Sequence, residues 1–136
     1  MKGKIPRDSY EAAYQKGREL YASDNKGIAA ALAELQEKTG INRASASNYI
    51  YNLRQMLRGA RYQRAMSAES TDAFLTWICR DYGMDGLKNA LLALEGYIDA
   101  NQSDMRSHTA VLAKHRGYLH SDGNSQSALK DLLDPP

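Results

Sequence analysis

The segment from residue 38 to residue 66 holds the side chains with the clearest capacity for chemistry. It contains six Lys and Arg residues and no Asp or Glu, so its formal charge is +6. The whole chain carries +2, and the difference leaves −4 for the rest of the molecule. A cationic stretch without acids is typical of surfaces that bind phosphate groups. The sequence predicts phosphate contacts from Lys38, Arg54, Arg58, Arg61, Tyr62 and Arg64.

A second group of side chains precedes most of these arginines. It combines short hydrogen-bonding groups with one arginine and one small methyl group, on the predicted outer face of a helix that starts at Arg43. Such groups match base edges, because arginine pairs with guanine, asparagine with adenine, and a methyl group with the thymine methyl. We therefore expect base contacts from Asn42, Arg43, Ala44, Ser47, Asn48 and Tyr51.

Two helices joined by a short turn would position these residues. Helical periodicity predicts one helix over 28–39 and a second over 43–58, with Gly40 supplying the left-handed backbone between them. If the second helix continued, Arg54, Arg58 and Arg61 would fall on one face. The pattern over 28–58 predicts a helix-turn-helix.

Apolar or small residues are expected at fixed distances from the turn of a helix-turn-helix. The expected positions are filled by Leu35, Ile41, Ala46 and Tyr49. Gln36 departs from the pattern, because a small residue usually packs there at the helix crossing.

The sequence predicts an all-α bundle of about six helices. The N-terminal region, 1–66, would include the helix-turn-helix, and a C-terminal helical region, 67–120, would pack on it. Gly83 is expected to separate a fourth helix from a fifth, and residues 121–136 look like a flexible tail. With 43% hydrophobic and 25% charged residues, the chain can form a packed core.

Several classes of function are not favoured by the sequence. We find no apolar run long enough for a membrane span, and the one cysteine cannot form a disulfide within the chain, so a cytoplasmic protein without membrane contact is expected. The spacing of His108, His115 and His120 fits no common zinc pattern, and Cys79 lies in an apolar stretch. The chain is predicted to be no enzyme and to need no cofactor or metal.

Residues 41–98 contain three segments that resemble a known family: "INRASAS-YI", "ML-G-RY-R" and "DYG--GL--AL-ALE-YI". With "SYEAAYQKGRELY" ahead of them, the chain is similar to the amino-terminal helical module of bacterial HNH endonucleases of restriction type. The resemblance implies a DNA-contacting or specificity module. It brings no active site, since no hairpin precedes the three histidines as an HNH site requires.

Double-stranded DNA is the partner we expect, bound by the chain as a homodimer. A protein-interaction module is the alternative: an inhibitor, immunity or phage accessory protein whose basic segment meets an acidic protein. A third reading is a specificity domain separated from its nuclease, which would make a nuclease subunit the protein partner.

Overall fold

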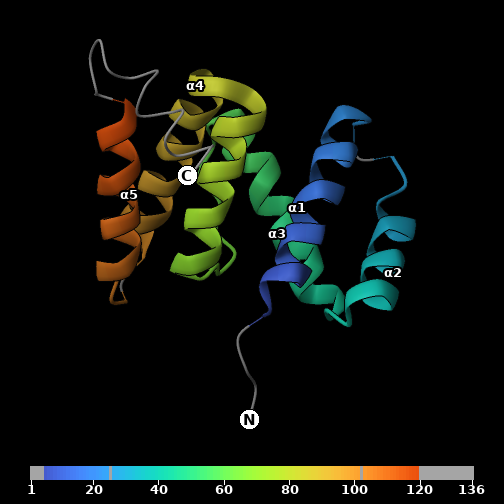
Figure 1. Ribbon diagram of the computed structural model, residues 1–136. Coiled ribbons are helices and arrows are strands. Elements are labelled where there is room, and N and C mark those ends of the chain that lie inside the picture. The colour runs from blue at the N-terminus through green and yellow to red at the C-terminus, as the bar shows by residue number, and fades with distance from the viewer. Residues whose placement is uncertain (1–4, 25, 102, 120–136) are drawn as a thin grey trace, which may run out of the picture. The chain divides into compact units, whose positions relative to one another are not determined.

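The computed structural model describes residues 5–24, 26–101 and 103–119, which form five helices and no strand (Figure 1). The all-α class is thereby confirmed for this part of the chain, and none of its helices is long and apolar enough to cross a membrane. The predicted tail, 121–136, and His120 lie outside the described residues. The helices are α1 (Arg7–Ala22), α2 (Ile28–Thr39), α3 (Arg43–Arg58), α4 (Ala68–Ala100) and α5 (Arg106–Leu119).

The chain divides into two compact units. Of the described residues, those up to 54 and residues 64–66 form the first unit, and residues 55–63 and those from 67 onward form the second. Helix α3 begins in the first unit and ends in the second. Residues 55–63, which the sequence places with the N-terminal region, therefore belong to the second unit.

In the first unit, α1 packs against α2 and against the part of α3 that belongs to this unit. The ring centroids of Tyr10 and Tyr49 lie 6.0 Å apart, and Gly17 approaches Leu53 so closely that a Cβ atom would lie 2.7 Å from Leu53 Cδ2. Tyr10 and Tyr14 are almost completely buried. The tyrosine rings thus form part of the core, where the apolar area of the rings contributes more to stability than the hydroxyl groups do.

The second unit is built on α4 and α5, which pack against each other (Figure 1). Helix α4 starts at a side-chain cap, because Ser67 Oγ accepts a hydrogen bond of 3.0 Å from the Ser70 amide. The helical backbone of α4 is interrupted at Gly83, which has φ 76° and ψ −168°, at the position where the sequence predicts one helix to end and the next to begin. With α4 counted as one element across this kink, the described residues form five helices where the sequence suggests about six.

Candidate nucleic-acid interface

The turn between α2 and α3 is fixed by local hydrogen bonds. Gly40 has φ 76° and ψ 3°, and its amide donates to the Gln36 carbonyl at 2.9 Å. Thr39 Oγ1 donates to the Leu35 carbonyl at 2.8 Å and accepts from the Ile41 amide at 3.2 Å. The left-handed conformation predicted for Gly40 is confirmed, and it sets the direction in which α3 leaves the turn.

Asn42 caps the start of α3. Its Oδ1 atom accepts a hydrogen bond of 2.8 Å from the Ser45 amide, and its carbonyl accepts from the Ala46 amide at 3.0 Å. The cap satisfies one of the free amide groups of the first turn. Because Oδ1 is used in this way, the amide nitrogen is the part of the Asn42 side chain left to meet a base.

The apolar positions predicted around the turn are buried. Leu35, Ile41, Ala46 and Tyr49 are each no more than 6% exposed. Gln36, the residue that departs from the pattern, is exposed and so does not pack at a helix crossing.

The residues predicted to contact bases remain accessible on α3. Asn42, Arg43 and Ala44 are exposed, and Ser47, Asn48 and Tyr51 are half-buried. Together they occupy the first turns of α3, within the first unit. Whether they touch DNA stays a prediction.

Arg64 joins this group from 16 positions further along the chain. Its Nη1 atom donates to Asn48 Oδ1 at 3.0 Å, and its guanidinium carbon lies 4.8 Å from the centre of the Tyr51 ring. Buried Asn52 holds the segment in place, because its Nδ2 atom donates to the Arg64 carbonyl at 3.1 Å. The sequence did not foresee this placement, since nothing local to Arg64 indicates a contact with α3.

A pocket of about 200 Å³ lies beside these side chains, within the first unit. Two arginines, one serine, one tyrosine and two isoleucines surround it. The lining residues are Ile28, Ser47, Ile50, Tyr51, Arg54 and Arg64. The pocket therefore combines positive charge with an apolar surface.

Lys38 differs from the other predicted phosphate ligands because it is already paired. Its Nζ atom lies 2.9 Å from Glu34 Oε2, and Lys16 Nζ lies 3.0 Å from the same atom. Hydrogen bonds from Lys38 and Lys16 lower the pKa of Glu34, which keeps the carboxylate ionised. Lys38 thus contributes less free positive charge than the sequence count suggests.

Arg58 and Arg61 belong to the second unit, and both are exposed. Helix α3 ends at Arg58, and the Ala60 amide turns back to donate to the Gln55 carbonyl at 2.9 Å. Since the helix does not continue to Arg61, the condition for a row of three arginines on one helical face is not met. Arg54 and Arg58 remain one turn apart on α3.

Tyr62 is buried, contrary to its predicted phosphate contact. It is 0% exposed and stacks on Tyr97 with ring centroids 4.7 Å apart. Burial also raises its pKa well above the ordinary value for tyrosine. Its hydroxyl cannot reach a phosphate in this structure, so we leave Tyr62 out of the interface.

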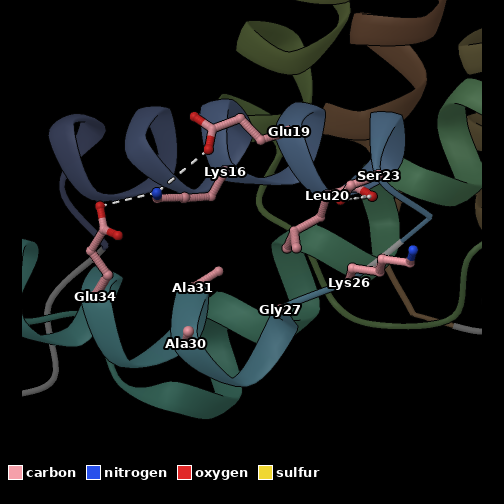
Figure 2. Close-up of a pocket in the computed structure, with 9 residues that line it drawn as sticks. All are labelled: Lys16, Glu19, Leu20, Ser23, Lys26, Gly27, Ala30, Ala31 and Glu34. Carbon is pink, nitrogen blue, oxygen red and sulfur yellow. Dashed lines mark hydrogen bonds and ion pairs between the residues drawn. The ribbon is translucent and has the colours of Figure 1, made fainter.

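A larger pocket of about 360 Å³ lies between α1 and α2 (Figure 2). Lys16, one of its two cations, lies 3.5 Å from Glu19 and 3.0 Å from Glu34. The other cation is Lys26, so two lysines and two glutamates line the pocket and cancel in formal charge, which makes it a weaker candidate for binding an anion than the face of α3.

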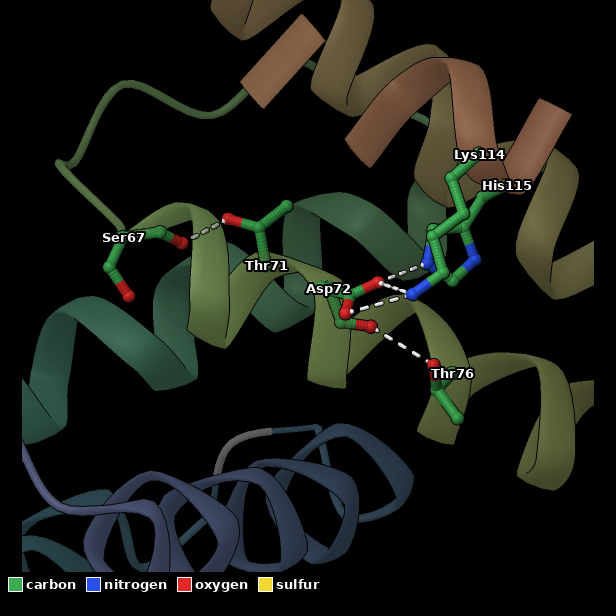
Figure 3. A network of polar contacts seen from close by, with 6 residues as sticks. All are labelled: Ser67, Thr71, Asp72, Thr76, Lys114 and His115. Carbon is green, nitrogen blue, oxygen red and sulfur yellow. Dashed lines mark hydrogen bonds and ion pairs between the residues drawn. The ribbon is translucent and has the colours of Figure 1, made fainter. Parts of the chain in front are cut away.

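The second unit contains a polar cluster between α4 and α5 (Figure 3). Asp72 Oδ1 lies 2.7 Å from His115 Nε2 and 3.0 Å from Lys114 Nζ. His115 is completely buried, and its Nδ1 atom has no hydrogen-bond partner. Burial lowers the pKa of His115 despite the opposing effect of Asp72. A neutral His115 that donates from Nε2 fits this arrangement, which joins the two helices.

Neither a metal site nor a reactive thiol is visible in the described residues. No three His, Cys, Asp or Glu side chains come together there as a metal-ligand group. Cys79 is 1% exposed, and burial raises the pKa of its thiol. A buried, protonated thiol is a poor nucleophile, so Cys79 acts as a small apolar core residue.

Of the candidates above, the face of α3 has the most free positive charge and the most accessible hydrogen-bonding groups. Compared with protein-family models, with curated proteins and with solved structures, the chain matches none of them.

Proposed function

We propose that this chain binds double-stranded DNA through a helix-turn-helix formed by α2, residues 40–42 and α3. The observation that carries the proposal is the accessible face of α3, where the arginines on the helix and beside it have no acidic partners. Arg43, Arg54 and Arg64 have no carboxylate within ion-pair distance among the described residues. DNA phosphates would supply the missing negative charge.

The dimensions and chemistry of α3 suit the major groove. A helix with its side chains is about 10–12 Å across, and the major groove is about 12 Å wide. The leading turns carry the small side chains of Ala44 and Ser47, which leave room for close approach to base edges. No acidic side chain lies on α3 to repel the phosphates that flank the groove.

The contacts in this proposal fall into two groups. Arg43, Ala44, Ser47, Asn48, Tyr51 and the amide nitrogen of Asn42 meet bases. Arg54, Arg58 and Arg61 meet phosphates. Base contacts determine sequence preference, whereas phosphate contacts determine affinity for any duplex.

Fluorescence anisotropy with a labelled random-sequence duplex tests the proposal. The logarithm of the binding constant should fall with the logarithm of the salt concentration, with a slope of about −3 for three phosphate contacts. Binding that is undetectable at low salt, or that does not depend on salt, would overturn it. A stoichiometric protein partner in the absence of DNA binding would instead support the protein-interaction reading.

Single substitutions separate the two groups of contacts. Arg43→Ala should reduce the preference among duplex sequences, and Arg58→Ala should weaken all duplexes alike. A cytoplasmic homodimer, with a role as specificity module for a restriction-type HNH nuclease, stays part of the proposal. An adjacent or fused nuclease reading frame would support that role.

A further inference from the structure

Arg64 was expected to contact a phosphate, but its surroundings suit a different task. A phosphate ligand usually lies at the edge of a reading helix, where the side chain meets the backbone of the duplex. Arg64 instead lies over two residues of the predicted base-reading face, at 3.0 Å from Asn48 Oδ1 and 4.8 Å from the centre of the Tyr51 ring. The segment that carries it is anchored to α3 through Asn52.

We infer that Arg64 is a specificity-determining residue that reads a guanine edge next to α3. The inference rests on the proposed function and deepens it, because it names a base-reading side chain that lies outside the reading helix. Asn48 and Tyr51 act as positioning residues for the guanidinium group in addition to their own contacts.

The hydrogen-bonding capacity of Arg64 supports this role. A guanidinium group has five N–H donors. One donates to Asn48, and the others have no acceptor among the described residues. Guanine presents two acceptors in the major groove, O6 and N7, and the planar fork of arginine fits both at once.

The stacked ring limits the freedom of the Arg64 side chain. Arginine loses rotamer entropy when it binds, and a guanidinium group already held against an aromatic face and an amide has less to lose. The pocket of about 200 Å³ next to it gives a base edge room to approach, with apolar Ile28 and Ile50 on its wall. Pre-organisation of this kind favours selectivity over general attraction.

Selection from a duplex library with a random core tests the inference. The wild-type chain should enrich sequences with guanine at one or more fixed positions, and Arg64→Lys should lose about 5- to 100-fold of that discrimination. Lysine keeps the charge but not the planar fork, so the salt dependence of binding should stay the same. Arg106→Lys in α5 is the matched control, since Arg106 lies outside the interface and is paired with Asp104.

Two further variants examine the role of Tyr51. Tyr51→Leu removes the aromatic face and should reduce discrimination at the same guanine position, whereas Tyr51→Phe keeps the ring and should restore it. Circular dichroism melts confirm that each variant is folded. If Tyr51→Leu and Tyr51→Phe behave alike, the positioning role of the ring is wrong.

The results separate this inference from the proposed function. Equal enrichment by the wild type and by Arg64→Lys would overturn the inference, as would salt-dependent binding by a wild type that enriches no sequence. In both cases the DNA-binding proposal would stand. A wild type that binds no duplex at any salt concentration would overturn both.

Discussion

Helices α3 and α5 have the same formal charge, but they differ in whether their cations pair with carboxylates. Each contains three Lys or Arg residues and no Asp or Glu. All three cations of α5 are paired with carboxylates: Arg106 with Asp104, Lys114 with Asp72 and Arg116 with Glu95. The three arginines of α3, Arg43, Arg54 and Arg58, have no such partner among the described residues.

The comparison shows that charge density alone does not identify a binding surface. A cation that is paired with a carboxylate would add little binding free energy by contacting a phosphate. An unpaired guanidinium group can neutralise a DNA phosphate, and this releases cations that were condensed on the duplex, which is favourable. The two helices therefore have different expected roles despite equal formal charge.

Replacing the three cations of one helix at a time should give the largest contrast. Changing Arg43, Arg54 and Arg58 to Gln should lower duplex affinity on the order of a hundredfold or more at about 0.1 M salt, since the variant loses one base contact and two phosphate contacts, each of which releases nearly one counter-ion. Changing Arg106, Lys114 and Arg116 to Gln should leave affinity and salt dependence nearly unchanged. Equal losses in the two variants, measured by anisotropy, would remove the distinction between the helices.

Two glycines with the same φ sharpen the comparison between the units. Gly83, in α4, has ψ −168°, a region essentially restricted to glycine, so Gly83→Asn should cost about 1–3 kcal/mol of unfolding free energy. Gly40, before α3, has ψ 3°, which asparagine tolerates, so Gly40→Asn should cost less than about 1 kcal/mol. Urea unfolding of both variants measures the difference, and a larger loss at Gly40 would contradict it.

Acid should destabilise the α4–α5 unit through His115 before it affects any carboxylate. The folded pKa of His115 lies below 6.5, so the unfolded chain binds this proton more readily. The contribution of neutral His115 to the free energy of unfolding is complete above pH 6.5. It is lost as the pH falls from 6.5 toward the folded pKa. The cause is burial, because protonation would place an N–H group at Nδ1 with no acceptor.

Asp72 should add a second loss at lower pH. Burial by itself would raise its pKa, but hydrogen bonds from His115 and Lys114 outweigh that effect and lower it below 3.8. Its contribution is therefore lost as the pH falls below 3.8. Unfolding free energies from pH 8 to pH 3 measure both steps, and His115→Gln should remove only the first. A His115→Gln variant that keeps the full loss below pH 6.5 would rule out His115 as its source.

The smallest effect is expected at Lys38. Its charge is paired with Glu34, so Lys38→Gln should change the salt dependence of duplex binding much less than Arg54→Gln does. Anisotropy at several salt concentrations compares the two variants. A change at Lys38 as large as that at Arg54 would show that pairing within the protein does not predict which cations bind DNA.

Local signals in the sequence determined the elements around the proposed reading face. The predicted bounds of α2 and α3 agree with the structure, Ile28–Thr39 and Arg43–Arg58. Glycine at Gly40 and the cap at Asn42 act within a few residues of themselves, so a single sequence reveals them. The buried positions around the turn followed from the same periodicity.

Tertiary structure decided which charges are free and which residues share a face. Arg64 reaches Asn48 across 16 residues, and Lys114 reaches Asp72 across 42. It also buried Tyr62, which the sequence places among the phosphate ligands. Composition and periodicity report on neighbours along the chain, whereas ion pairing and burial depend on residues that only folding brings together.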